Sequence, residues 1–274
     1  MRSADLHTHT NYSDGTATPE ELIAEAVKAG LSAVAITDHD TVEGVERAIA
    51  ASAGGQVEVL PGIELTSEHE GLEIHLLGYL LDHRDKSLLE RLQLLKKNRV
   101  DRIYRICDKL KALGLSLAPE KVFDLSAIGT VGRLHVAQAM VKEGLVNSTY
   151  EAFNKYIGDK CPAYVANFKL SPQEAIGLIL KFSGIPVLAH PYSMGRDDLI
   201  PRFAEYGLMG LEVYYLEHTR SMVDSYLHTA KKLNLLVTGG SDYHGKSKPN
   251  VYMGAMKIPY ELVEKLKEAK ARAD

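Results

Sequence analysis

The residues best able to do chemistry are histidines and carboxylates that recur at short spacings near both ends of the chain. His7 and His9 are two residues apart, and so are Asp242 and His244. Residues two apart in a β-strand point to the same face, so each pair can present both side chains to one ion. Histidine is the side chain that most often binds metals. The two pairs therefore predict a metal site, in a chain that has 11 histidines and no tryptophan.

Further candidate ligands lie in or near the ends of predicted strands. They are Asp14, His39, Glu64, His75 and His190. The carboxyl ends of barrel strands converge on one face, where active sites form, so we expect all of these side chains to lie together. Nitrogen and oxygen ligands without thiolate suit Mn, Fe or Zn, and the set is too rich in histidine for Ca or Mg. Nine ligands are too many for one ion, which implies two or three divalent ions, with a carboxylate such as Glu64 bridging a pair.

Short apolar segments alternate with helical patterns, and these elements must position the ligands. Strands are predicted at residues 4–6, 32–37, 57–60, 73–81, 185–189, 210–214 and 235–238. Helices fill most of the intervals, and a last one is predicted over residues 261–272. Apolar strands alternating with helices are typical of a parallel sheet covered by helices. Repeated this often, the pattern predicts an α/β fold of the TIM-barrel type.

Several helix starts are marked by capping sequences. Thr18-Pro19-Glu20-Glu21 and Ser171-Pro172-Gln173-Glu174 each place a hydroxyl at the N-cap, proline at the first position and glutamate at the third. This pattern predicts a helix after each cap. Asp40 is predicted to cap another helix that begins near Thr41. Asp38, on the other side of His39, is a candidate to orient a ligand through a hydrogen bond.

The middle of the chain differs from its two ends. Residues 84–161 are predicted to be helical without a convincing strand, and their apolar residues include positions 92, 95, 100, 103, 106, 110 and 113. We therefore predict a barrel formed by residues 1–83 and 162–274, with residues 84–161 as a helical insertion. The insertion has 15 Lys and Arg against 9 Asp and Glu, whereas the remainder has 17 against 27. This basic insertion is either an ordinary solvated surface or a lid that attracts anions.

Composition disfavours several classes of protein. The chain of 274 residues is 45% hydrophobic, which is ordinary for a globular protein. Its formal net charge of −4 does not favour nucleic-acid binding by the molecule as a whole. Cys107 and Cys161 are too few for a zinc-cysteine site or a disulfide framework and are expected to be small buried hydrophobes. The sequence shows no signal-peptide pattern and no apolar run of membrane-spanning length. We therefore expect a cytoplasmic protein without membrane contact.

Four segments resemble the motifs of the polymerase-and-histidinol-phosphatase (PHP) family. They are Asp5-Leu6-His7-Thr8-His9 with Ser13-Asp14-Gly15, Thr37-Asp38-His39-Asp40-Thr41, Ala189-His190-Pro191 and Gly240-Ser241-Asp242-Tyr243-His244. The resemblance implies a distorted (β/α)7 TIM-like barrel, here with a helical insertion domain, and a site for three metal ions. It also implies three ligand sets: His7, His9, Glu64 and Asp242 for one ion; Glu64, His75 and His190 for a second; and Asp14, His39 and His244 for a third.

Within that family, the insertion resembles the branch that hydrolyses nucleoside bisphosphates and trims oligonucleotides. In that branch the insertion supplies phosphate-binding groups, and Arg133, His135 and Lys160 match those positions. The alternative is that these three are ordinary surface cations. Arg99, which interrupts the apolar face of its helix, is a weaker candidate. The resemblance thus implies a small phosphorylated substrate, either a nucleotide or a short oligonucleotide.

Phosphoester hydrolysis suits such a site physically. Divalent ions cancel the charge of the substrate and lower the pKa of a bound water towards about 7. We expect a metal-activated hydroxide to attack in line, without a covalent intermediate. His190 and His39 are the catalytic candidates, and a third ion or a protonated His190 would stabilise the leaving oxygen. The predicted activity is hydrolysis of nucleotide phosphates, in particular the 3′-phosphate of nucleoside 3′,5′-bisphosphates, or of short oligonucleotides.

Other functions remain open on the sequence. Histidinol-phosphate phosphatase would keep the same site, although a basic insertion favours a substrate with more than one phosphate. Similar metal barrels cleave amides, but a neutral substrate needs no cationic lid. A non-catalytic metal module would show lost ligands, and none is lost here. Long duplex nucleic acid is disfavoured because a small basic patch covers few phosphates, and the sequence leaves the oligomeric state open.

Overall fold

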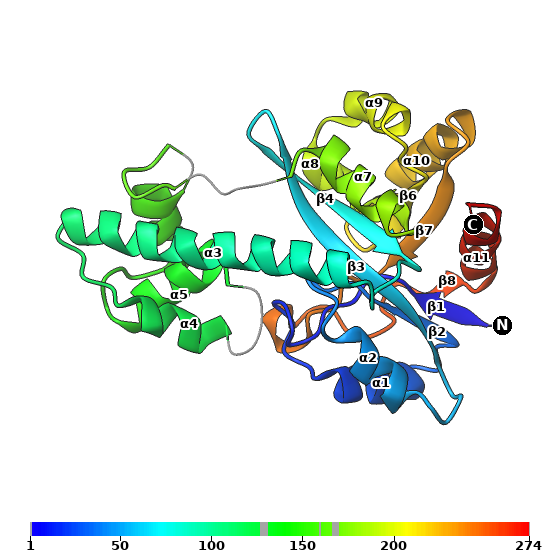
Figure 1. Ribbon diagram of the computed structural model, residues 1–274, viewed down its shortest axis with the longest axis horizontal. Helices are drawn as coiled ribbons and strands as arrows, with labels where there is room; N and C mark the ends of the chain where they lie inside the picture. Colours follow the sequence, from blue (N-terminus) through cyan, green and yellow to red (C-terminus); the bar gives the residue numbers. More distant parts are fainter. Residues whose placement is uncertain (1, 127–130, 159, 166–169, 274) are drawn as a thin grey trace. The chain divides into compact units, whose positions relative to one another are not determined.

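The structure is a computed structural model that describes residues 2–126, 131–158, 160–165 and 170–273 (Figure 1). The chain divides into two compact units, which are described separately. Met1–Leu89 and Lys169–Asp274 form the first unit, and Glu90–Phe168 forms the second. Among the residues described, none of the helices has the length and apolar character needed to cross a membrane.

In its described residues, the first unit is built on a sheet of eight strands. They are β1 (Ser3–Asp5), β2 (Ala33–Ile36), β3 (Glu58–His69), β4 (Leu72–Tyr79), β5 (Ile185–Leu188), β6 (Gly210–Tyr215), β7 (Leu236–Gly240) and β8 (Ile258–Pro259). Their order is β7-β6-β5-β4-β3-β2-β1-β8. Leu6, just after β1, donates its N–H to the carbonyl of Gly239 in β7, 3.2 Å away. The sheet therefore curls into a nearly closed barrel, which confirms the predicted fold.

One strand runs opposite to the predicted direction. β4 is antiparallel to β3 and β5, whereas β1–β2, β2–β3, β5–β6 and β6–β7 are parallel pairs. The short strand β8, which was not predicted, is also antiparallel to its neighbour β1. Glu70 and Gly71, both with positive φ, form the tight turn that joins β3 to β4 without a helix. The expectation of a wholly parallel sheet is therefore wrong here. His75 lies in the amino-terminal half of β4, opposite Thr66 near the carboxyl end of β3, so the reversal brings it to the edge where the other strands end.

The helices of the first unit follow most of its strands in sequence. They are α1 (Pro19–Lys28), α2 (Val45–Ala51), α7 (Pro172–Lys181), α8 (Pro191–Met194), α9 (Ile200–Glu205), α10 (Arg220–Lys232) and α11 (Glu261–Ala273). Both predicted capping boxes are present: the Thr18 hydroxyl accepts the N–H of Glu21, and the Ser171 hydroxyl accepts that of Glu174. Because such a cap contributes about 1 kcal/mol, α1 and α7 begin where the sequence predicts.

The predicted cap at Asp40 is wrong. Helix α2 begins at Val45, and Gly44 is its N-cap. Asp40 instead has a φ of 52°, and its Oδ1 accepts the N–H of Thr66 at 3.0 Å. Its own N–H donates to the carbonyl of Glu64 at 2.9 Å. Asp40 therefore ties the loop after β2 to β3, which fixes His39 beside Glu64.

The barrel core is filled by apolar side chains from the strands and α11. Its members include Leu6, Leu60, Leu77, Val187, Ile258, Val263 and Leu266. Tyr79 is fully buried among them, and its hydroxyl donates to the carbonyl of Leu6 at 2.8 Å. Burying one large apolar side chain contributes about 1.5–3 kcal/mol. The hydrogen bond removes the penalty of burying the hydroxyl, so Tyr79 can fix the segment that carries His7.

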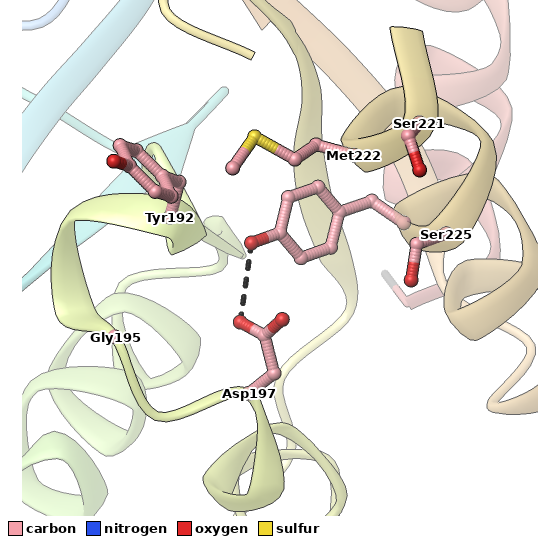
Figure 2. Close-up of a pocket in the computed structure, with 7 residues that line it drawn as sticks. Tyr192, Gly195, Asp197, Ser221, Met222 and Ser225 are labelled. Atoms are coloured by element: carbon pink, nitrogen blue, oxygen red, sulfur yellow. Dashed lines mark hydrogen bonds between the residues drawn. The ribbon is translucent and has the colours of Figure 1, made fainter. Parts of the chain in front are cut away.

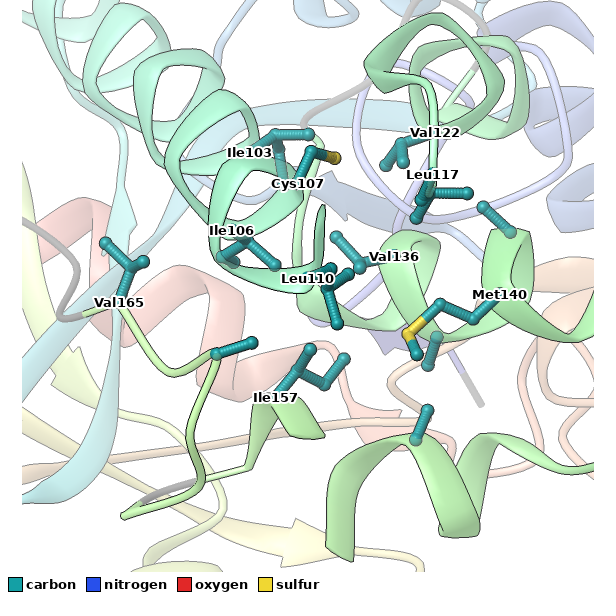
Figure 3. Packing of buried hydrophobic residues seen from close by; sticks show 14 of the residues in the cluster. Ile103, Ile106, Cys107, Leu110, Leu117, Val122, Val136, Met140, Ile157 and Val165 are labelled. Atoms are coloured by element: carbon teal, nitrogen blue, oxygen red, sulfur yellow. The ribbon is translucent and has the colours of Figure 1, made fainter. Parts of the chain in front are cut away.

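The second unit contains helices only, in the residues that the structure describes. They are α3 (Lys86–Ala112), which begins in the first unit, α4 (Pro119–Ser126), α5 (Arg133–Lys142), α6 (Thr149–Ala152) and a π-helical turn (Phe153–Ile157). Figure 3 shows their packing around Ile106, Leu110 and Met140. The helical spacing of the sequence thus identifies the buried face of α3, except for Leu113, which follows the helix and is exposed.

The two cysteines are free, as the sequence predicts. Cys107 packs in the core of the second unit (Figure 3), and burial raises the pKa of its thiol to about 11. Cys161 is only half-buried, and its thiol lies near the carbonyls of Phe153 and Asn154. Cys107 therefore fits the expectation of a small buried hydrophobe better than Cys161 does.

Candidate metal centre

His7 and His9 lie just beyond β1, where the barrel closes. His9 donates its N–H to the carbonyl of Tyr243 at 2.8 Å, and Tyr243 donates to the carbonyl of His7 at 3.3 Å. Gly240 makes this close approach possible, because a Cβ on it would lie only 2.4 Å from the backbone nitrogen of His7. Both imidazoles are fully buried. The backbone thus holds the His-x-His pair beside the segment that carries Asp242 and His244.

Asp5 also stabilises the contact between the end of β1 and the segment that carries Asp242. Its carboxylate accepts the N–H of Ser241 at 2.8 Å, the hydroxyl of Ser241 at 2.6 Å and the N–H of Gly254 at 3.0 Å. Burial raises the pKa of Asp5 to about 6, although these hydrogen bonds act to lower it. Asp5 therefore connects the residue before Asp242 to the strand before His7.

Glu64 lies at the centre of the cluster. Its side chain is 1% exposed, and its Oε2 lies 3.2 Å from Nε2 of His7, 3.2 Å from Nε2 of His9 and 3.3 Å from Nε2 of His39. Its Oε1 lies 3.0 Å from Nδ1 of His75 and 3.2 Å from Nε2 of His190. The two oxygens of one carboxylate therefore face five imidazoles.

Asp242 and Asp14 are the other two carboxylates among the predicted ligands. Oδ1 of Asp242 lies 3.2 Å from Nε2 of His9 and 3.3 Å from Nδ1 of His244. Oδ1 of Asp14 lies 3.2 Å from Nε2 of His244, and its Oδ2 lies 3.8 Å from Nε2 of His39. The structure thus brings all nine predicted ligands into one cluster, although they come from segments spread between residues 7 and 244.

The spacing of the donor atoms fits metal coordination. Among the residues that the structure describes, four groups of three or four donors have all their ligand atoms within 4.8 Å of one another. They are His9 with Asp14, His39 and His244; His7 with His190 and Asp242; His7 with His9 and Glu64; and His39 with Glu64 and His75. Metal–ligand bonds of about 2.0–2.2 Å place neighbouring ligand atoms roughly 3 Å apart. The first group contains the predicted third set with His9 added, and the third contains most of the predicted first set.

Glu212 is a functional candidate that sequence reasoning missed. It is fully buried in β6; its Oε1 lies 3.0 Å from Nδ1 of His7, and its Oε2 accepts the N–H of His190 at 2.7 Å. A carboxylate on one imidazole nitrogen fixes the ring so that the other nitrogen can bind a metal. The signal in the sequence was one glutamate inside the otherwise apolar strand Gly210–Tyr215.

Lys248 is a second missed residue. Its Nζ lies 2.5 Å from Oδ2 of Asp242, which also accepts the hydroxyl of Tyr215 at 3.2 Å. A short turn sets its position, because Lys248 donates its N–H to the carbonyl of Gly245. Its side chain is 41% exposed, so the cation reaches the edge of the cluster from the surface of the first unit.

None of the described hydrogen bonds of Asp38 is made to His39, the ligand that follows it in the chain. Its Oδ1 accepts the N–H of Thr10 at 2.7 Å and the hydroxyl of Ser13 at 2.6 Å, and its Oδ2 accepts the hydroxyl of Thr10 at 2.6 Å. Burial raises the pKa of Asp38. Asp38 therefore fixes the loop that leads to Asp14.

The predicted substrate-binding residues Arg99, Arg133, His135 and Lys160 all lie in the second unit. Arg133 is the first residue of α5, and its guanidinium lies 5.6 Å from the ring centroid of Tyr164. Nδ1 of His135 accepts the N–H of Gly132 at 3.1 Å, so His135 helps to cap the same helix. Lys160 is exposed and has a φ of 68°, and Arg99 is half-buried on α3. Their role in substrate binding stays a prediction.

The charges of the cluster shift the pKa values of its members in opposite directions. Burial acts to lower the pKa of His7, but Glu212, Glu64 and Asp242 outweigh it and raise that pKa well above its usual value. The pKa of His9 is likewise raised to about 9, and that of His75 to about 10. Burial acts to raise the pKa of Glu64, but the surrounding imidazoles hold it well below its usual range.

These shifts predict the pH dependence of metal binding. His9 and His75, with pKa values of about 9 and 10, hold protons at pH 7 in the metal-free chain. A metal must displace such protons, so its affinity rises with pH towards that range and falls as the pH drops. Calorimetric titration with Mn²⁺ at pH 6.5 and 8.5, in buffers of different ionisation enthalpy, should show proton release and tighter binding at the higher pH. Equal affinity with no proton release would contradict the prediction.

Glu212 provides a second prediction. Glu212→Gln keeps the shape of the side chain but weakens the orientation of His7. Since an outer partner of a ligand typically contributes 10- to 100-fold in metal affinity, we expect Mn²⁺ affinity to fall by about that factor. The metal-free variant should still show a thermal unfolding transition, which would show that it is folded. Glu205→Gln, on the exposed surface of α9, is the matched control, and equal affinities in the two variants would refute the role of Glu212.

Comparisons with known proteins agree with this geometry. Residues 5–155 match the family model described as PHP domain. The chain is 33% identical over 245 residues to a 5′-3′ exoribonuclease of Haemophilus influenzae, which covers 88% of this chain and 89% of the relative. It is 30% identical over 250 residues to a 3′,5′-nucleoside bisphosphate phosphatase of Chromobacterium violaceum, covering 89% and 88% of the two chains.

A solved structure shows the same fold. A protein from Bifidobacterium adolescentis, assigned as a metal-dependent phosphoesterase, superposes with a TM-score of 0.84 at 31% identity. The match covers 97% of this chain and 95% of that chain. The family match spans more than half of the chain and includes six of the nine clustered ligands, His7, His9, Asp14, His39, Glu64 and His75. The chain therefore belongs to the PHP family and is a phosphoric ester hydrolase.

Proposed function

We propose that the cluster binds two or three divalent metal ions and that the enzyme hydrolyses phosphate esters of small nucleotides. The main support for this proposal is the environment of Glu64, whose two oxygens face five imidazoles at 3.0–3.3 Å. One carboxylate placed in this way can bridge two ions. The nitrogen and oxygen donors, without thiolate, suit Mn, Fe or Zn.

The cluster contains donors for each of the three ligand sets. His7, His9, Glu64 and Asp242 would hold one ion; Glu64, His75 and His190 a second; and Asp14, His39 and His244, with His9 close by, a third. When bound, divalent ions neutralise phosphate charge, polarise the phosphoryl oxygens and activate a water at neutral pH. The metal identity and the number of ions are part of this proposal.

The exposure of the cluster members indicates where a substrate would enter. The side chains of His7 and His9 are fully buried, whereas those of His190, His39, His75 and Asp14 are 12%, 16%, 20% and 35% exposed. These four residues therefore line the side that solvent reaches. We assign His190 and His39 to contact with the reacting phosphate, because they combine partial exposure with fixed positions. His190 is fixed by Ser193, whose hydroxyl lies 2.7 Å from its Nδ1, and by the bond from its N–H to Glu212.

The substrate class is supported by charge and by the relatives. The two curated relatives named above are a nucleoside bisphosphate phosphatase and an exoribonuclease. Both names describe enzymes that act on phosphate esters of nucleotides. The excess of Lys and Arg in residues 84–161 suits an anion with more than one phosphate. We propose that the enzyme removes the 3′-phosphate of nucleoside 3′,5′-bisphosphates or trims short oligonucleotides.

Phosphate-binding cations are proposed in both units. Arg133, His135 and Lys160, with Arg99 as a further candidate, are assigned to substrate phosphate from the second unit. Lys248 is assigned to the same role in the first unit, because an ammonium has three donors and its contact with Asp242 leaves others for a phosphate oxygen. Histidinol phosphate is the competing substrate, since it would use the same metal cluster.

The proposal predicts a substrate order. With added Mn²⁺, phosphate release should be faster for adenosine 3′,5′-bisphosphate than for adenosine 5′-monophosphate or histidinol phosphate. The physical reason is that a second phosphate gains contacts with the cations, each charged hydrogen bond contributing about 1.5–3 kcal/mol. Phosphate release is measured at equal substrate concentration, and kcat and KM are determined separately.

Single substitutions test the proposed phosphate-binding residues one at a time. Arg133→Ala and Lys248→Ala should each raise KM for the bisphosphate about tenfold or more, whereas the exposed Lys142→Ala and Lys246→Ala should not. A preference for histidinol phosphate would keep the metal site but overturn the nucleotide assignment. If none of the three compounds releases phosphate, the proposed substrate class is wrong.

A further inference from the structure

A pocket on the first unit lies outside the metal cluster. It has a volume of about 470 Å³, within the range of small-molecule sites. Its walls come from α8, the short helix after it and the beginning of α10 (Figure 2). The lining side chains are those of Tyr192, Asp197, Ser221, Met222, Ser225 and Tyr226.

The chemistry of these walls suits a flat, neutral ligand with N–H donors. Tyr192 is 47% exposed and offers a ring for stacking, and the end of the Met222 side chain points toward it in Figure 2. The Asp197 carboxylate accepts the hydroxyl of the buried Tyr226 at 3.1 Å. Among the described lining residues there is no lysine, arginine or histidine. A phosphate would therefore face Asp197 without a compensating cation, whereas an amino group would find an acceptor.

The pocket is connected to the metal cluster through α8 and through aromatic contacts. Tyr192 follows His190 by two residues, and His190 is the N-cap of α8. The rings of His190, Tyr215, His218 and Tyr226 form a continuous series, with centroids 5.4, 5.3 and 5.0 Å apart. Tyr192 on the pocket wall is thus two residues along the chain from the ligand that we assign to the reacting phosphate.

We propose that this pocket binds the nucleobase of the nucleotide whose phosphate reacts at the metal cluster. This inference rests on the proposed function and extends it to the recognition of the base. The ring of Tyr192 stacks on the base, and Asp197 accepts its N–H groups. Because nucleobases are flat and uncharged, they match the apolar and carboxylate walls, while the phosphate goes to the cluster.

The carboxylate also predicts which base is preferred. Guanine presents two neighbouring N–H donors on one edge, so a carboxylate can accept both. Uracil presents a single N–H between two carbonyls, which a carboxylate repels. A good bidentate pair discriminates between bases, so guanosine should bind about tenfold more tightly than uridine. Asp197→Asn replaces one acceptor by a donor and should reduce or reverse that preference.

The absence of tryptophan from the sequence allows a direct test. Tyr192→Trp introduces a single fluorescent reporter at the pocket, and Tyr150→Trp, at a position that is 78% exposed in the second unit, is the matched control. Guanosine, uridine and ribose 5-phosphate are titrated into each metal-free protein. We expect saturable quenching of the pocket reporter by guanosine, weaker quenching by uridine, and none by ribose 5-phosphate or in the control. Calorimetry of guanosine with the wild-type chain checks that the new ring has not created the site.

The outcomes separate the pocket from the proposed function. Phosphate release from nucleotides without guanosine quenching or calorimetric binding would overturn the pocket and leave the proposed function standing. Guanosine binding without phosphate release would support the base site and refute the proposed function. Equal binding of guanosine and ribose 5-phosphate, or an unchanged preference in Asp197→Asn, would overturn the proposed base recognition.

Discussion

The burial of Glu64 among five imidazoles is the constraint on which the rest of the site depends. A carboxylate that is 1% exposed is costly to bury unless it is neutralised. In the metal-free chain His7, His9 and His75, whose pKa values are all raised, supply that charge as protons, whereas burial lowers the pKa of His39 to about 4. Divalent cations would replace these protons. The cluster is thus a concentration of negative charge that needs cations, and phosphate ester hydrolysis is chemistry that such cations promote.

Holding this cluster together requires precise backbone positions from distant parts of the chain. Asp5 connects β1 to the end of β7, and Asp40 connects the loop after β2 to β3. Gly240 allows the closest approach, against the backbone of His7. Glu212 acts from β6 on both His7 and His190. Polar residues in these loops and strands therefore form a second layer that supports the ligands, while the apolar barrel core fixes the strands themselves.

Much of the architecture and the clustering of the ligands could be predicted from the sequence, because both leave short-range signals. The spacing of His7 and His9 and the caps at Thr18 and Ser171 are examples. The contacts that were missed are long-range. Glu212 contacts residues 22 and 205 positions away, and one glutamate in an apolar strand does not identify its partners. Asp40 has the composition of a cap, but its carboxylate bonds instead to the backbone of Thr66. The reversed strand β4 depends on a two-residue turn whose effect on topology is not evident from apolar patterning.

We propose that Glu64 lies between two metal ions. The most direct measurement is anomalous diffraction from crystals grown with Mn²⁺, with data on either side of the manganese absorption edge. We predict at least two anomalous peaks, with Glu64 contributing one oxygen to each of two ions, and loss of at least one peak in Glu64→Gln. A single ion that Glu64 does not contact, or wild-type crystals without any anomalous peak in the cluster, would contradict the claim.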